Sequence, residues 1–326
     1  MTKKFYIGTV ILLATAALVL VSLCLGTVTI SPLQIAGVLR GEDIGPAGNI
    51  LLNMRVPRVL MALVIGASLS VSGTIFQALL RNSLADPFII GVSSGAAFGA
   101  TLSIIFSFPY TVTVLFAFGG SIATVLTVFT ISRRLKMGTS SMILSGIALS
   151  FILSSAVMLL FSMTRSEQVH RALMWLMGDL GTARFDMIGE MGIVSIVIIF
   201  ISFMFKRHLD IISFGERFSR NLGVTEGVMI LLFWIASLLS ALSVSLAGVI
   251  GFVGLVVPHV VRRIFGPGHV WLLPVSAVAG AIFLMVSDTA GRIIAPPYEI
   301  PVGIITGFCG GIFFLLFLLR KGDNSL

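Results

Sequence analysis

Long apolar runs set the main constraint on how this chain of 326 residues can fold. A bilayer core of about 30 Å takes a helix of roughly 20 apolar residues, and only helices or closed barrels satisfy the backbone there. The runs do not alternate in polarity as barrel strands do, so we expect helices. Ten runs have spanning length or come close to it: 5–26, 59–80, 88–107, 110–132, 141–163, 187–205, 227–247, 249–264, 271–293 and 302–320.

These runs predict an all-α polytopic membrane protein with ten transmembrane helices, in a single domain over residues 1–326. The first run follows Lys3 and Lys4, as in a signal peptide. It is longer than a usual signal core, and we expect it to remain as the first transmembrane helix.

Composition agrees with this class of protein. Apolar residues make up 57% of the chain and charged residues 10%, whereas a soluble domain carries about 25% charge. The net charge of +8 is also a property of nucleic-acid-binding proteins. Lysine and arginine gather in the inside loops of membrane proteins, which explains the excess more simply, so we expect no nucleic-acid partner.

Charge also predicts the orientation. An even number of spans places both termini on one side, and with the termini inside, 14 of the 21 lysines and arginines lie inside. This bias indicates cytoplasmic N- and C-termini. Seven arginines remain outside: Arg40, Arg55, Arg58, Arg165, Arg171, Arg184 and Arg292. Three long connections tend to carry function, namely 27–58 and 164–186 outside and 206–226 inside.

No catalytic or metal-binding pattern is present in the sequence. It has no GxxxxGK[ST] phosphate loop and no HExxH motif, and its four histidines do not pair at metal-ligand spacing. Cys24 and Cys309 lie in apolar runs without ligand spacing. We therefore expect no catalytic residue, no metal site and no cofactor bound by this chain.

Small residues recur four apart in two of the runs, which lets helix backbones approach closely in lipid. We expect both stripes to pack against neighbouring helices: Gly91, Gly95 and Gly99, and Gly303, Gly307 and Gly311. Glycines and Pro258 also weaken the helix in "GFVGLVVPHVVRR", residues 251–263, where we interpret His259 as a packing residue.

Two further sets of residues each allow two interpretations. In the inside segment 209–226, Phe214, Phe218 and Leu222 recur at helical spacing, which predicts an amphipathic helix on the membrane surface or in a partner's groove. Arginines at the outer ends of spans either cap helices and snorkel to headgroups or form a basic docking surface; they are Arg55, Arg58 and Arg292.

Several blocks of sequence resemble a known family. They are "LNMRVPRVLMALVIGASLSVSGTIFQALLRNSLADPFIIGVSSGAAFGA", "LSGIALSF", "WLMGDLG", "GFVGLVVPHVVRR" and "EIPVGIITGFCGG". In order and spacing, from about Gly26 to Arg320, they are similar to the signature blocks of FecCD-type permeases. Those proteins are the membrane subunits of ABC importers for ferric siderophores, haem and cobalamin.

The resemblance implies a type II ABC importer permease bundle in the cytoplasmic (inner) membrane of a bacterium or archaeon. It implies a homodimer, or a pair with a second permease, with the translocation path at the interface. Two ATPase subunits would bind inside and carry the ATP and Mg, which agrees with the missing phosphate loop. A substrate-binding protein would dock outside.

The resemblance also assigns roles to residues. It places an ATPase-coupling segment at 209–226, including Phe214, Gly215, Glu216, Arg217, Arg220, Leu222 and Gly223. It assigns binding-protein docking to Arg55, Arg58 and Arg292. It places residues 81–87 as a turn at the cytoplasmic gate, where Pro87 restricts Asp86 to extended geometry; a plain structural turn is the alternative. The gate residues would be Asn82, Ser83 and Leu84, facing Thr139, Ser140 and Ser141.

The expected cargo is an iron complex, with a ferric siderophore favoured by its frequency in the family and haem or cobalamin as alternatives. The alternative function is an ion-gradient-driven secondary transporter, which needs ionisable groups inside the membrane. Asp288 is the best candidate for such a relay, although an i,i+4 pair with Arg292 explains it equally well.

Overall fold

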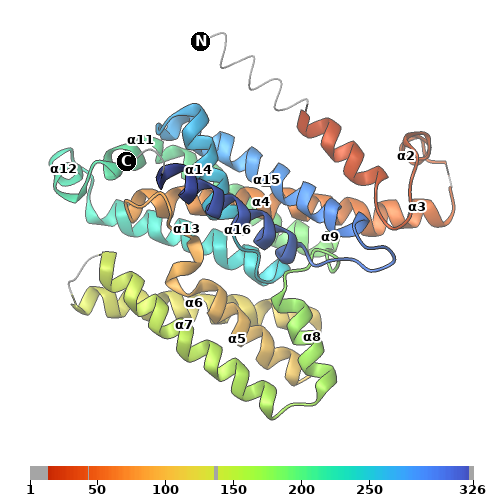
Figure 1. Ribbon diagram of the computed structural model, residues 1–326, viewed down its shortest axis with the longest axis horizontal. Coiled ribbons are helices and arrows are strands. Elements are labelled where there is room, and N and C mark those ends of the chain that lie inside the picture. The colour runs from red at the N-terminus through yellow and green to blue at the C-terminus, as the bar shows by residue number, and fades with distance from the viewer. Residues whose placement is uncertain (1–13, 43, 136–138, 323–326) are drawn as a thin grey trace, which may run out of the picture.

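The structure, a computed structural model, describes residues 14–42, 44–135 and 139–322. Every regular element in these ranges is a helix (Figure 1). The first half of the chain holds Ala14–Cys24, α2 (Pro32–Leu39), α3 (Pro46–Ile50), η1 (Leu51–Arg55), α4 (Val56–Leu79), η2 (Pro87–Ile90), α5 (Val92–Ile105), α6 (Tyr110–Leu135) and α7 (Thr139–Ser162). The second half holds α8 (Ser166–Leu176), α9 (Phe185–Met187), η3 (Ile188–Gly192), α10 (Ile193–Met204), α11 (Lys206–Ser213), α12 (Glu216–Asn221), α13 (Glu226–Ala247), α14 (Val253–Phe265), α15 (His269–Ile293) and α16 (Val302–Gly322).

Each of the ten predicted apolar runs contains a helix in the described ranges, although 249–252, at the start of one run, is not helical. Six are long and apolar enough to cross a membrane alone: Pro46–Leu79, Tyr110–Arg134, Ser140–Ser162, Phe185–Met204, Glu226–Ala247 and His269–Ile293. Shorter apolar helices are Ala14–Cys24, Val92–Ile105 and Val302–Phe317, and α14 has 13 residues. The all-α prediction is confirmed, and the chain is an integral membrane protein.

The connection predicted over 27–58 contains helices. It contains α2, and its second half is the start of one continuous helix from Pro46 to Leu79. Pro46 occupies a first-turn position, where a missing N–H costs nothing, and η1 accommodates a wide turn inside the helix. The polar residues of this stretch concealed the helix from a search for apolar runs.

The helices form two groups. Figure 1 shows α5 to α8 below a group that contains α4 and α13 to α16. The chain crosses between them twice, and each crossing has a glycine at positive φ: Gly91, φ +83°, before α5, and Gly178, φ +75°, after α8. Between the groups, Phe129 of α6 stacks on Phe233 of α13, with ring centroids 5.4 Å apart.

Backbone-to-backbone contacts at glycine hold the helix pairs together. A Cβ added at Gly66 of α4 would lie 2.3 Å from the Gly280 carbonyl oxygen of α15. One added at Gly73 would lie 1.8 Å from the Gly254 carbonyl oxygen of α14. Helices α4, α14 and α15 therefore touch at distances that any side chain would prevent.

The predicted glycine stripes behave differently from each other. Added Cβ atoms at Gly95 and Gly99 would lie 2.4 Å and 2.1 Å from backbone oxygens of α6, and one at Gly303 would lie 2.2 Å from the Met177 oxygen. These confirm the packing prediction. It is wrong within the chain for Gly307 and Gly311, where no described atom lies within 4 Å of the added Cβ.

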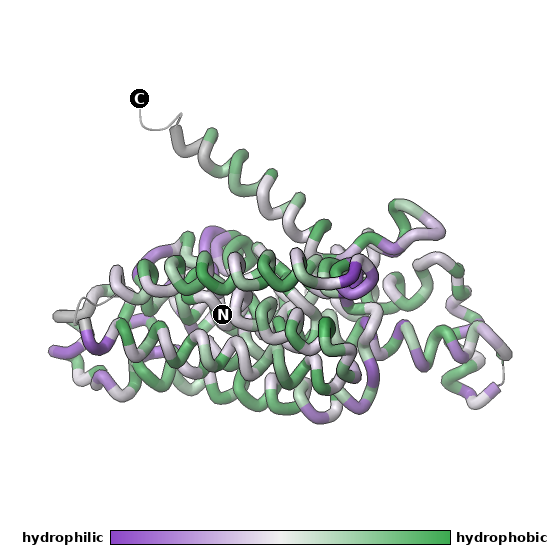
Figure 2. The backbone as a smooth tube through the Cα atoms, turned by 90° about the horizontal axis from the view of Figure 1, so that it is seen from below, coloured by the Kyte–Doolittle hydropathy of each residue, from purple (hydrophilic) through white to green (hydrophobic). Residues whose placement is uncertain are grey.

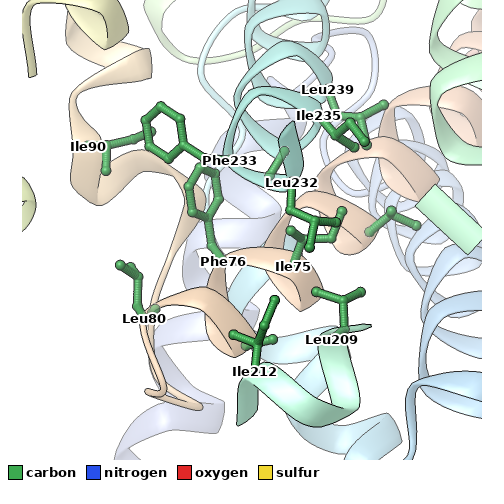
Figure 3. Packing of buried hydrophobic residues seen from close by; sticks show 14 of the residues in the cluster. Ile75, Phe76, Leu80, Ile90, Leu209, Ile212, Leu232, Phe233, Ile235 and Leu239 are labelled. Carbon is green, nitrogen blue, oxygen red and sulfur yellow. The ribbon is translucent and has the colours of Figure 1, made fainter. Parts of the chain in front are cut away.

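A buried apolar cluster fills the space at the C-terminal end of α4 (Figure 3). Phe76 of α4 meets Phe233 of α13 edge to face at 6.0 Å between centroids. Leu209 and Ile212, 0% and 3% exposed, bring α11 into the same cluster beside Leu80. Helix α11 is thus part of the core and not a loosely attached surface helix.

Helices α7 and α16 leave long apolar faces uncovered. Only 11% of the most apolar stretch of α7 is buried. The C-terminal part of α16 projects away from most of the bundle (Figure 2). Its exposed residues include Phe308, Ile312, Leu315, Leu316 and Leu319. Apolar surface of this extent requires lipid or another subunit.

Candidate functional site

The predicted coupling segment is two short helices, which corrects the single amphipathic helix expected over 209–226. Helix α11 ends at Ser213, and α12 begins at Glu216 after Gly215, whose φ is +119°. Side chains strongly disfavour that conformation, so glycine breaks the helix here. A second glycine with positive φ, Gly223, φ +83°, follows α12 and turns the chain toward α13.

The aromatic side chains of this segment point outward. Phe214 is 75% exposed and Phe218 is 50% exposed, with ring centroids 5.7 Å apart, and Leu222 is also exposed. The side chains of Glu216 and Arg217 lie outside the described part of the structure. Exposed apolar side chains on a segment that is anchored to the core are suited to insert into a groove of a partner protein.

A polar pair that sequence reasoning missed anchors α11 from the opposite side. The Asp210 carboxylate accepts a hydrogen bond from the His269 backbone N–H at 2.8 Å, and the same oxygen lies 2.7 Å from Nδ1 of that histidine. The two residues are 59 positions apart. No spacing rule connects them, so the sequence alone gave no signal for this pair.

The predicted turn at 81–87 is present. Asn82 Oδ1 accepts from the Leu84 N–H at 2.9 Å, and Asp86 is extended, with φ −96° and ψ 141°, as expected before Pro87. The Asp86 carboxylate caps η2 by accepting from the Phe88 N–H at 2.7 Å. These local bonds account for the turn whether or not it also gates a path.

The other half of the predicted gate has its own partners. The Ser141 hydroxyl lies 2.9 Å from the Ser132 hydroxyl of α6, Ser140 is exposed, and the side chain of Thr139 lies outside the described residues. Helix α7 meets η2 further along, where a Cβ added at Gly146 would lie 2.5 Å from the Ile89 oxygen. The gate role of Asn82, Ser83 and Leu84 with Thr139, Ser140 and Ser141 stays a prediction.

An apolar groove of about 460 Å³ between η2 and α7 contains Asp86. Phe88, Ile147 and Phe151 also line it. Burial raises the pKa of Asp86 to about 6, although the hydrogen bond from the Phe88 N–H acts in the opposite direction. This carboxyl therefore destabilises the folded chain at neutral pH, where it is ionised.

Replacing Asp86 with asparagine should stabilise the chain at high pH and not at low pH. The amide oxygen can still accept from the Phe88 N–H, while the cost of a buried charge disappears. With the folded pKa raised to about 6 from 3.8, the gain should be about 1–3 kcal/mol at pH 8 and fade as the pH falls toward 4. Thermal unfolding in detergent at several pH values measures this. Asp186→Asn, at an exposed carboxyl, is the control, and an equal response of both variants would contradict the prediction.

The three predicted docking arginines are buried within a network at the N-terminal end of α4 and the C-terminal end of α15. Arg55, Arg58 and Arg292 are 4%, 9% and 3% exposed. Arg58 Nε lies 2.9 Å from Asp288 Oδ1, and its Nη1 lies 2.5 Å from Glu299 Oε2. Arg292 Nε lies 3.2 Å from Asp288 Oδ2, so the predicted i,i+4 pair is confirmed.

Hydrogen bonds extend the network to the first described helix. Arg55 donates to the carbonyl oxygens of Leu23 and Cys24 at 2.7 Å and 3.0 Å. Arg292 donates to the carbonyl oxygens of Leu25 and Ser22 at 3.0 Å and 3.1 Å. The arginines thus satisfy backbone oxygens where that helix ends, which is the capping role in a buried form. Their docking role stays a prediction.

His259 lies where the sequence suggested a packing residue. Its ring meets Phe317 of α16 at 4.5 Å between centroids, edge to face, and Phe313 at 6.3 Å. These contacts attach α14 to α16 next to Pro258.

Comparisons with known proteins match most of the chain to one family. A model of the FecCD transport family matches residues 12–320. The hemin transport system permease protein HmuU of Yersinia pestis is 37% identical over 283 residues, covering 85% of this chain and 85% of its own. The cobalamin import system permease protein BtuC of Halobacterium salinarum is 39% identical over 275 residues, covering 83% and 73%.

A solved structure described as an inward-facing metal-chelate type ABC transporter covers 98% of this chain and 99% of its own, with a TM-score of 0.87 at 29% identity. The matched range 12–320 includes the coupling segment, the turn at 81–87 and the buried arginine network. The chain therefore belongs to the FecCD transport family.

Proposed function

We propose that this chain is the permease subunit of an ATP-driven ABC importer for an iron complex, with a ferric siderophore favoured; haem, and the cobalt complex cobalamin, are the alternatives. The observation that carries the proposal is the family match over residues 12–320. Relatives named for hemin and cobalamin transport, and the metal-chelate type neighbour, support this class of cargo.

The proposed topology has ten membrane spans with both termini in the cytoplasm, in the inner membrane of a bacterium or archaeon. Six long apolar helices, three shorter ones and α14 supply ten segments. The short ones cross only with help, since 13 residues of helix reach about 20 Å and a bilayer core is about 30 Å. Neighbouring α4 and α15 would shield their ends.

Three kinds of partner follow from this function. Two ATPase subunits would hold ATP and Mg and receive the coupling segment 209–226. A substrate-binding protein would dock outside, at or above Arg55, Arg58 and Arg292. A second copy, or a second permease, would cover the apolar faces of α7 and α16, and the uncovered Gly307 and Gly311 suit close helix approach there.

The secondary-transporter alternative loses support from the site. Its best relay residue, Asp288, is 2% exposed and is paired with both Arg58 and Arg292. A carboxyl fixed between two guanidinium groups is poorly suited to release and rebind a proton during transport. We therefore do not favour an ion gradient as the energy source.

Changing Phe218 to aspartate should remove the ATPase subunits from the purified complex. Phe218 is 50% exposed on α12, so the change should cost little folding stability. It should abolish an apolar contact with the partner and lower the affinity for the ATPase at least about 10-fold. Phe185→Asp is the matched control, because Phe185 is also 50% exposed but lies at the start of α9, outside in the proposed topology.

The measurement is co-purification of the cognate ATPase, followed by ATP-dependent uptake into proteoliposomes of a ferric hydroxamate siderophore, haemin or cyanocobalamin. Uptake of one cargo that needs both ATP and a binding protein supports the proposal and identifies the cargo. Failure of wild type to retain any ATPase would contradict it.

A further inference from the structure

Helix α11 is the link between the outward-facing α12 and the two long helices that cross the bundle. One of its faces contributes Leu209 and Ile212 to the cluster around Ile75, Phe76 and Leu80 of α4 (Figure 3). A different residue, Asp210, contacts α15. A single short helix therefore lies in an apolar cluster that also contains Leu273 and Ala277 of α15, and a polar pair bonds it to the first turn of α15.

The contact with α15 is a helix cap supplied by another helix. Gly268, the N-cap residue of α15, has no side chain to accept from the first turn. Asp210 Oδ1 takes that place, accepting from the His269 N–H at 2.8 Å. A carboxylate oxygen at a helix N-terminus is favourable because it meets unpaired N–H groups and the positive end of the helix dipole.

The His269 side chain makes this cap specific in position. Its Nδ1 lies 2.7 Å from the same Asp210 oxygen, and the histidine is 2% exposed. One oxygen thus accepts from two points on α15, one on the backbone and one on the ring. The Asp210 side chain is 34% exposed, so the bond depends on this two-point geometry more than on burial. Neither sliding nor rotation of α11 against α15 preserves both contacts.

The coupling segment also lies close to the turn at 81–87. The Arg81 guanidinium Nη1 lies 4.0 Å from the position that a Cβ at Gly215 would occupy. Arg81 is itself in the left-handed region, φ +51°, immediately beyond α4. The chain just before α12 therefore passes close to Arg81, and α12 is linked to α4 through α11.

We propose that Asp210 and His269 are positioning residues that fasten α11 to α15, so that a movement imposed on α12 moves α4 and α15 together. The inference rests on the proposed function, because it needs an ATPase that acts on α12. Without the Asp210–His269 contact, α11 still packs in the apolar cluster with α4 and still carries α12, but the first turn of α15 is no longer bonded to α11. ATP hydrolysis should continue while transport per ATP falls.

The test compares Asp210→Ala, Asp210→Asn and the control Arg207→Ala, which alters an exposed residue of the same helix. Each full-length permease is assembled with its ATPase and binding protein in proteoliposomes, and three quantities are measured: ATPase retained, ATP hydrolysed and cargo taken up. Asp210→Ala should retain the ATPase and lower uptake per ATP about 10-fold. Asp210→Asn should keep most of the coupling, since its amide oxygen can accept both bonds.

A second measurement uses the permease alone in nanodiscs and does not depend on the ATPase. Amide hydrogen exchange at the first turn of α15 should be faster in Asp210→Ala than in wild type, Asp210→Asn or Arg207→Ala. If wild type assembles with no ATPase, the proposed function fails, and exchange still decides whether Asp210 fastens α11. The inference is overturned if Asp210→Ala matches Arg207→Ala in both exchange and uptake per ATP.

Discussion

Replacing Gly73 with alanine is expected to destabilise the protein by more than about 3 kcal/mol, beyond the usual range for overpacking. The added Cβ would lie 1.8 Å from the Gly254 carbonyl oxygen and 2.7 Å from its Cα, so α4 and α14 would have to separate. Backbone cannot rotate out of the way as a side chain does. Separation would also disturb Pro87, whose Cγ lies 2.7 Å from the Cβ position at Gly254.

Thermal unfolding in detergent, followed by intrinsic fluorescence, measures this effect. The matched control is Gly119→Ala on α6, where no described atom lies within 4 Å of the added Cβ. That change should leave the monomer unaffected or stabilise it slightly, because alanine favours helix by about 0.5–1 kcal/mol. Equal melting temperatures for Gly73→Ala and wild type would show that the two helices are not in backbone contact.

Replacing Arg58 with alanine is expected to cost about 3–5 kcal/mol, the usual loss when one partner of a buried ion pair is removed. Arg58 holds Asp288, which is 2% exposed, through two bonds of 2.9 Å and 3.1 Å from Nε. Asp288 would keep only Arg292 as a charged partner in a nearly dry site. The measurement is the melting temperature of the purified permease at fixed detergent and salt.

Glu299→Gln is the control for this prediction. Glu299 also pairs with Arg58, but its side chain is 39% exposed, so losing its charge should cost no more than about 1 kcal/mol. If Arg58→Ala melts no lower than Glu299→Gln, the buried network does not stabilise the fold. The result also affects tests of docking, because charge reversal at Arg58 perturbs folding before it perturbs any partner.

Apolar run length predicted most of the fold, because the bilayer imposes a direct relation between sequence and helix. The predicted helix ends were wrong where polar residues lie inside a helix, as in Pro46–Leu79. They also failed at Gly215, where a residue that can continue a helix adopts φ +119° instead. Whether this glycine continues or breaks the helix depends on the packing of α11 against α4, and a single sequence does not show that packing.

The sequence predicted where the candidate site residues lie along the chain, but not which residues they contact. Exposed Phe214 and Phe218 follow from helical spacing. The pairs Arg58–Asp288 and Asp210–His269 join residues 230 and 59 positions apart, and local patterns carry no information about such contacts. The glycine stripes show the same limit, since the spacing of Gly307 and Gly311 permits close approach without saying what approaches.

The glycine contact between α4 and α15 has a mechanical consequence. The two helices touch backbone to backbone at Gly66 and Gly280, are tied by Arg58 and Asp288 near one end, and both hold α11 near the other. Such a pair resists bending and shear along its length and behaves as a single beam. A force applied at the α11 end of this pair is therefore transmitted to the Arg58 end with little loss.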